Sequence, residues 1–184
     1  GLSGVSRQCG NLQPHAGGAL GKTQASKRLQ IAGLKLKPSK CSVLQREVAF
    51  LGHVMTEDGI KTDPEKIRAV VEWPVPTCVR EVRAFVGLAS YYRRFVKGFA
   101  EIAAPLHELT KKNARFTWGE NHQAAFETLK QKLVEAPVLV APDDEHSYIL
   151  DTDASDHAMG AVLSMVIDGE ERPVAYASRV FSRC

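Results

Sequence analysis

Between Thr77 and Gly98, apolar residues recur every three or four positions, which is the spacing of one face of an α-helix. Pro74 and Pro76 stand just before this run, and a helix cannot continue through them. The apolar positions are Val79, Val82, Phe85, Val86, Ala89, Tyr92 and Phe95. The pattern predicts an amphipathic helix over 77–98, which any fold of this chain has to accommodate.

Three further helices are predicted beside it. The first begins at the sequence Thr62-Asp63-Pro64-Glu65, which holds an N-cap candidate, a first-turn proline and a glutamate placed for a capping box, and it ends near Trp73. The second covers 101–109. The third follows Thr117 and Glu120, a second capping-box pair, and ends at Pro137. Four helices joined by proline-containing turns predict a compact helical unit.

Strand patterns flank this helical unit. Residues 36–62 contain short β-branched and aromatic runs broken at 45–46 and at 57–59, and Gly52 within one run indicates a bulge or a close approach of another backbone. From Ser147 onward, three runs joined by short turns predict an antiparallel meander. Residues 1–22 lack periodicity and are expected to be poorly ordered, and a short helix over 23–32 is expected to end at Gly33. The fold class predicted is α+β.

Composition narrows the function classes. The longest apolar runs are too short to span a bilayer, the N-terminus does not resemble a secretory signal, and the missing initiator Met suggests a fragment. Four scattered cysteines without zinc-site spacing are expected to be reduced thiols of an intracellular protein. The net charge is +3, and its basic residues gather in two tracts, over 22–40 and over 80–97, which could line a groove for phosphates or be solvated helix faces.

Three aspartates follow the strand-like run that begins at Tyr148. Asp151 and Asp153 are two residues apart, so on a strand they point to the same face, and a divalent cation is the usual partner of two adjacent carboxylates. The alternative is that Asp151, Asp153 and Asp156 are exposed strand-end and turn residues. The residues alone leave both interpretations open.

Residues 33–182 closely resemble the reverse transcriptase to RNase H region of Pol polyproteins from gypsy-type LTR retrotransposons. The matching segments, in order, are AGLKLKPSKC, FLGHVMTEDGIKTDPEKIRAV, WPVP, VREVRAFVGLASYYRRFVKGFAEIAAPLHELTKK, FTWGENHQAAFETLKQKL, APVL, DTDASDHAMGAVLS and RPVAYASR. The resemblance implies an end of the polymerase palm with its primer-grip hairpin over 27–61, a helical thumb and linker over 62–142, and the first, truncated RNase H-like strands over 143–184. Residues 1–26 match poorly.

The resemblance also implies roles for individual residues. The primer-grip hairpin, which positions the primer 3′ end, corresponds to Phe50, Leu51, Gly52 and His53. The thumb helix would face an RNA/DNA hybrid or primer–template duplex with a stripe of residues four apart, Arg83, Gly87 and Tyr91, whereas Tyr92 is expected in the core. Asp153 matches the first metal-binding aspartate of RNase H.

RNase H chemistry uses two Mg²⁺ ions, which one aspartate cannot hold. The resemblance implies that the other ligands follow Cys184, and no Tyr-x-Asp-Asp polymerase motif occurs in the sequence. We therefore expect Mg²⁺ in the intact parent enzyme, no stably bound cofactor here, and neither polymerase nor ribonuclease activity. Two alternatives stay open: a nucleic-acid-binding or interaction module used by a host, and a non-catalytic connection domain of a retroviral-type enzyme, in which Asp153 is a relic.

Overall fold

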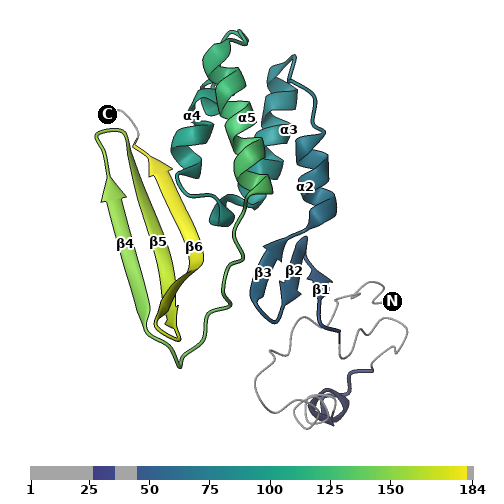
Figure 1. Cartoon of the computed structure of the whole chain (residues 1–184). Helices are drawn as coiled ribbons and strands as arrows, with labels where there is room; N and C mark the ends of the chain where they lie inside the picture. The colour runs from purple at the N-terminus through teal and green to yellow at the C-terminus, as the bar shows by residue number, and fades with distance from the viewer. Residues whose placement is uncertain (1–26, 36–44, 182–184) are drawn as a thin grey trace. The chain divides into compact units, whose positions relative to one another are not determined.

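The computed structural model describes residues 27–35 and 45–181 of the 184-residue chain. The chain divides into two compact units, 1–57 and 58–184. Predictions that fall on 1–26, on 36–44 or on the last three residues, including half of the basic residues of the first tract, lie outside the described residues. The α+β fold predicted from the sequence is confirmed, and Figure 1 shows its helices and antiparallel strands.

The first unit contains a helical turn and a hairpin. Residues 27–31 are helical, and Gly33, at φ 73°, ends the helix as predicted. Two backbone hydrogen bonds, from Leu34 N to Leu29 O and from Gly33 N to Gln30 O, close this end. Further on, strand β1 (Val48–Phe50) pairs antiparallel with strand β2 (His53–Thr56).

The second unit begins with strand β3 (Gly59–Thr62), which is followed by α2 (Pro64–Val71). The predicted start of α2 is confirmed, because the Asp63 side chain accepts a hydrogen bond of 3.0 Å from Glu65 N. Strand β3 also bonds to a distant segment: Ile60 N donates to Leu139 O, and Leu139 N donates back to Ile60 O. This bridge holds the end of the helical unit beside its beginning.

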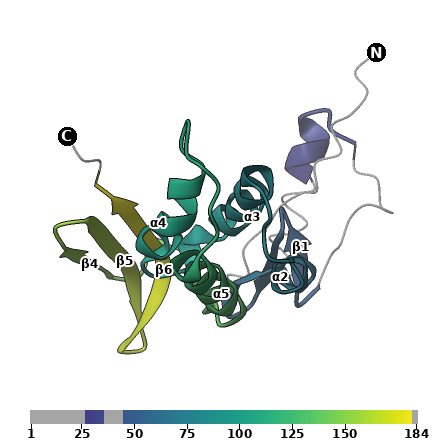
Figure 2. The ribbon, with the colours of Figure 1, turned by 90° about the horizontal axis from the view of Figure 1, so that it is seen from above.

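The remaining helices complete a bundle around one apolar core (Figures 1 and 2). They are α3 (Val79–Tyr91), the 3₁₀ turn η2 (Arg93–Phe95), α4 (Phe99–Leu109) and α5 (Glu120–Val134). The largest fully buried side chains of this core include Tyr92, Phe85, Phe95, Phe126, Leu106 and Leu129. Burial of Tyr92 confirms its predicted place in the core.

Two helix boundaries differ from the sequence predictions. The single helix expected over 77–98 ends at Tyr91, where the chain tightens into η2. The capping box expected from Thr117 and Glu120 is wrong, because the N-cap of α5 is Gly119, whose N–H donates to His122 Nδ1 over 3.1 Å. Thr117 instead lies in the extended segment between Phe116 and Trp118, whose rings pack against the core.

The predicted meander is confirmed by strands β4 (Tyr148–Ala154), β5 (Ala158–Ile167) and β6 (Glu170–Val180), which form one antiparallel sheet in that order. The register of β5 and β6 shifts between Leu163 and Ser164. Strand β6 is the strand beside α4 and η2, whereas β4 is the far edge and is exposed along its whole length (Figures 1 and 2). No helix of the described residues is long and apolar enough to cross a membrane.

Candidate nucleic-acid interface

The β1–β2 hairpin presents Leu51 and Gly52 at its tip. Phe50 and His53 are paired across the strands, and the two residues between them have φ values of 47° and 68°. Positive φ at both positions is typical of the tightest hairpin turn, so Gly52 is a turn residue and the bulge expected within a strand is corrected. The side chain of Leu51 is 68% exposed, and its backbone has a positive φ that residues with a side chain rarely adopt; no motif in the sequence predicts this conformation.

His53 secures the tip. Its Nδ1 lies 2.9 Å from Leu51 O, and because a carbonyl only accepts hydrogen bonds, Nδ1 is the donor in this contact. This contact closes the turn at the backbone of Leu51, whose side chain is exposed. A partner that binds at the hairpin tip would contact the exposed Leu51 side chain, whose backbone carbonyl accepts a hydrogen bond from His53.

Helix α3 separates a buried face from an exposed one. Val82, Phe85, Val86 and Ala89 are buried, whereas Arg83, Gly87 and Tyr91 are exposed and follow each other at intervals of four residues. We call these three residues the α3 stripe. The α3 stripe is therefore open to solvent along the helix.

Each member of the stripe has a different surrounding. A Cβ added to Gly87 would meet no atom within 4 Å, so internal packing does not require glycine there. The ring of Tyr91 is 49% exposed and meets the buried ring of Tyr92 edge to face, with centroids 5.0 Å apart. Burial raises the pKa of the Tyr92 phenol to about 12, so this ring stays neutral.

Arg83 has an internal contact that sequence reasoning missed. Its Nη2 donates to Thr110 O over 2.9 Å, which joins α3 to the C-terminal end of α4. A cation at this helix end is favourable because the last carbonyls of a helix lack amide partners. Arg83 is therefore placed by a hydrogen bond while its side chain remains at the surface.

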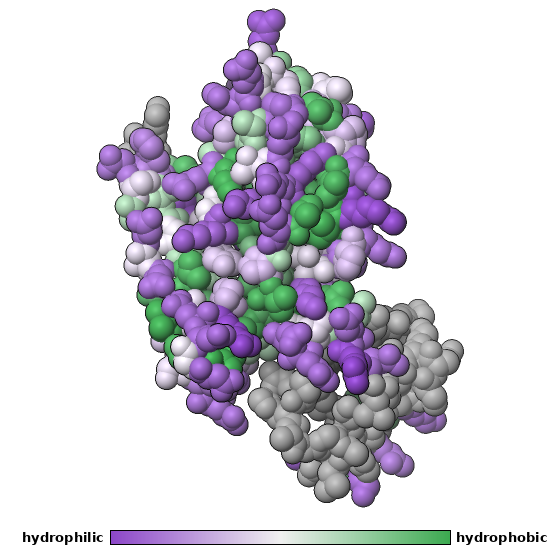
Figure 3. Space-filling view, in the orientation of Figure 1, coloured by the Kyte–Doolittle hydropathy of each residue, from purple (hydrophilic) through white to green (hydrophobic). Residues whose placement is uncertain are grey.

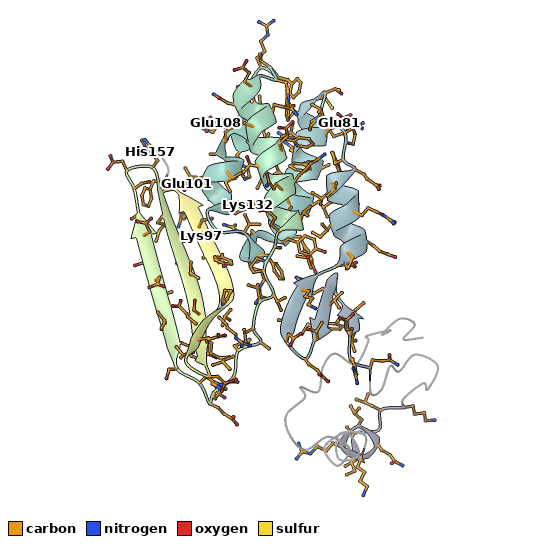
Figure 4. The ribbon with its side chains drawn as sticks, viewed as in Figure 1. Glu81, Lys97, Glu101, Glu108, Lys132 and His157 are labelled. Atoms are coloured by element: carbon orange, nitrogen blue, oxygen red, sulfur yellow. The ribbon has the colours of Figure 1, made fainter. Side chains whose placement is uncertain are left out.

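The second basic tract is divided by the fold. Arg80, Arg83 and Lys97 are exposed, and Figure 4 shows Lys97 in the region between the bundle and the sheet. Arg93 is exposed as well, and both Arg93 and Arg94 donate to carbonyls of β6. The two interpretations of this tract, a groove for phosphates or solvated helix faces, both stay open, and for Arg93 and Arg94 the structure adds a contact within the protein.

Asp153 lies on the exposed edge strand β4. Its partners across the sheet are Gly160 and then Ser178, so no second carboxylate stands in its row. Within 27–35 and 45–181, no cluster of three or more His, Cys, Asp or Glu side chains could hold a metal ion. The described residues therefore do not fit a two-metal centre, and we derive no metal-dependent step from them.

Comparisons with known proteins agree with this geometry. Residues 118–184 match the family described as RNase H-like domain found in reverse transcriptase. The retrovirus-related Pol polyprotein from transposon 297 of Drosophila melanogaster is 42% identical over 84% of this chain, and that from transposon 412 is 43% identical over 82%. The Pol polyprotein of the feline endogenous virus ECE1 is 40% identical over 80%.

Solved structures give the same result. A foamy viral protease-reverse transcriptase in complex with double-stranded DNA covers 86% of this chain with a TM-score of 0.73 and 28% identity. A second structure of that enzyme, in complex with an RNA/DNA hybrid, covers 77% with a TM-score of 0.66 and 29% identity. The chain spans only 12–14% of the three Pol polyproteins, and 28% and 19% of the two viral chains. These findings confirm the similarity of this chain to the reverse transcriptase and RNase H region of retroelement Pol polyproteins.

Proposed function

We propose that this chain is the duplex-holding part of a retroelement reverse transcriptase. The observation that carries the proposal is the 86% coverage by a viral reverse transcriptase whose structure was determined with double-stranded DNA. The proposed parts are the end of the palm with its primer grip over 27–61, the thumb and linker over 62–142, and the start of the RNase H-like domain over 143–184. In this arrangement the hairpin tip, Phe50 to His53, positions the primer 3′ end.

The proposed contact of the thumb is the α3 stripe. Arg83 would supply a cation for the backbone phosphates, Gly87 would let the backbone of the duplex approach the helix, and Tyr91 would pack on a sugar. Such contacts recognise the shape of a hybrid duplex and not its base sequence. The ligand is accordingly an RNA/DNA hybrid or a primer–template duplex of any sequence.

Polymerase and ribonuclease activities are proposed for the whole polyprotein, with Mg²⁺ as the metal and Asp153 as one of its ligands. For the chain itself we propose binding without turnover. The support is that Asp153 has no second carboxylate in its row of the sheet. Incubation of the chain with a hybrid and Mg²⁺ is expected to leave the RNA strand intact, and cleavage that disappears in Asp153→Asn would refute this part.

Gly87 offers a test in which stability and binding change in opposite directions. In the free protein, Gly87→Ala adds a methyl group to open space inside a helix, which should stabilise the fold by about 0.5–1 kcal/mol. In a complex, the same methyl group would press on the duplex, and overpacking of this kind costs about 1–3 kcal/mol. We expect weaker binding of a fluorescein-labelled RNA/DNA hybrid by a more stable protein.

Arg83→Ala and a matched control complete the test. Loss of one phosphate contact should weaken binding by about five-fold, or about 1 kcal/mol, with a shallower dependence on salt. The control is Arg172→Ala, an exposed arginine on β6 that pairs with Glu170. Fluorescence anisotropy at low salt would contradict the proposal if the Gly87, Arg83 and Arg172 variants all bound the hybrid like the parent.

A further inference from the structure

The first turn of α4 is capped by a residue from the sheet. Its N-cap residue, Gly98, has no side chain that could accept a hydrogen bond from the free amides of the first turn. Ala100 N donates instead to Ser178 Oγ over 2.9 Å, although Ser178 lies on β6, 78 positions later. Ser178 is 9% exposed, so this hydroxyl is held in a buried contact between helix and strand.

Two arginines hold the same strand through its backbone. Arg93 Nη2 donates to Ser178 O over 2.7 Å, and Arg94 Nη2 donates to Val174 O over 3.3 Å. Strand β6 is an edge strand of its sheet, and it receives donors from outside the sheet: the two arginines, and Val140 N, which donates to Pro173 O. Between the two arginine contacts, Tyr176 packs against the helical core.

These contacts connect the two regions to which the proposed function assigns roles. Arg93 follows Tyr91, the last member of the α3 stripe, by two residues. Ser178 is opposite Gly160, which is opposite Asp153, so Ser178 and Asp153 lie in one row on one face of the sheet. With strands about 4.8 Å apart, Asp153 is about 10 Å from Ser178 across this row.

We propose that Arg93, Arg94 and Ser178 form a clasp that fixes the RNase H-like sheet to the helical bundle. The clasp keeps the Asp153 strand at one distance from the α3 stripe, so that a duplex held by the stripe meets the sheet at a set position. Arg93 and Ser178 are positioning residues in this account. That this distance serves duplex binding rests on the proposed function, whereas the rigid connection between sheet and bundle does not.

The clasp is tested on the full chain by double electron–electron resonance. Nitroxide labels are placed at two exposed positions, Ala84→Cys on α3 and Thr152→Cys on β4, after the four native cysteines have been replaced by serine. The parent should give one narrow distance distribution. Ser178→Ala, which removes only the cap of Ala100, and Arg93→Ala, which removes the side-chain bond to β6, should each broaden it about two-fold.

The control is Arg179→Ala, because Arg179 is exposed and next to Ser178 in the sequence. Distributions that stay narrow in both clasp variants overturn the proposal, and a broadening in Arg179→Ala equal to theirs does so as well. If circular dichroism shows that Arg93→Ala is unfolded, Ser178→Ala alone decides. The affinity for an RNA/DNA hybrid is measured in parallel. Absence of binding would count against the proposed function only, because the clasp is tested by the distance distributions alone.

Discussion

Lys130 of α5 joins two helices of the bundle, and its replacement should weaken the helical unit. Its Nζ donates to Val71 O over 2.9 Å and also to Trp73 O, two carbonyls at the end of α2. The ammonium group also lies 4.3 Å from the centroid of the Phe126 ring. Burial lowers the pKa of this ammonium from its ordinary value. Lys130→Met keeps most of the side-chain length and removes only the charge and the donors.

The expected loss follows from these contacts. Hydrogen bonds from a charged donor contribute about 1.5–3 kcal/mol, and a cation over an aromatic ring adds about 0.5–1 kcal/mol near the surface. Water can partly replace the donor, because Lys130 is only half-buried, and the charge no longer has to be desolvated in the variant. We therefore expect a decrease of about 2 kcal/mol in the free energy of unfolding, or about 4–8 °C in Tm for a domain of this size.

Urea denaturation followed by tryptophan fluorescence measures this loss. Both tryptophans, Trp73 and Trp118, pack against the core of the second unit, so the signal reports on the bundle. The control is Lys132→Met on the same helix, where the lysine is exposed (Figure 4) and the change should stay within about 0.5 kcal/mol. A Lys130→Met protein as stable as the Lys132→Met protein would refute the assigned contacts.

Two further changes test the fold at other points. Gly59→Ala should destabilise the chain by about 2–4 kcal/mol in the same assay, because Gly59 has a positive φ and an added Cβ would overlap Leu139 O. The control is Gly169→Ala, which should cost less, because Gly169 also has a positive φ but an added Cβ would meet open space. Hydrogen bonds from the His146 ring and from two backbone amides lower the pKa of Asp143 below its ordinary value of 3.8. The ionised carboxylate therefore stabilises the folded protein fully above pH 3.8, and this stabilisation is lost as the pH falls through the lowered pKa of the folded state. Thermal melting at about pH 5 and about pH 3 should therefore show less acid sensitivity in Asp143→Asn than in the parent, and equal sensitivity would count against the contact.

Elements set by local chemistry could be predicted from the sequence. Asp63 and Pro64 define the start of α2 because an N-cap side chain and a first-turn proline act within a few residues. The meander could be predicted because the turn at Asp168 and Gly169 and the length of the runs determine antiparallel pairing. The exposed stripe of α3 likewise follows from a period of four residues.

Features that depend on distant partners could not be predicted in this way. The apolar period continues through Tyr92 and Phe95, so the sequence shows no reason for α3 to end at Tyr91. The helix gives way there to η2, which brings Arg93 to β6, a strand about eighty residues later. Leu51 at a positive φ is a further case, because a leucine carries no turn signal of its own.

Charge alone left the role of the Arg93–Arg94 pair open. Figure 3 shows hydrophilic residues over most of the visible face, interrupted by apolar patches, so polar side chains do not mark one region of this face. A guanidinium group donates equally well to a phosphate oxygen and to a strand carbonyl. For Arg93 the sheet edge provides the acceptor, and for Arg83 the end of α4 provides one while the side chain stays exposed. The acceptor that an arginine meets therefore depends on which element the fold places beside it. In the clasp, η2 carries Arg93 and Arg94 to the edge of the sheet, and β6 supplies the carbonyls that accept from them.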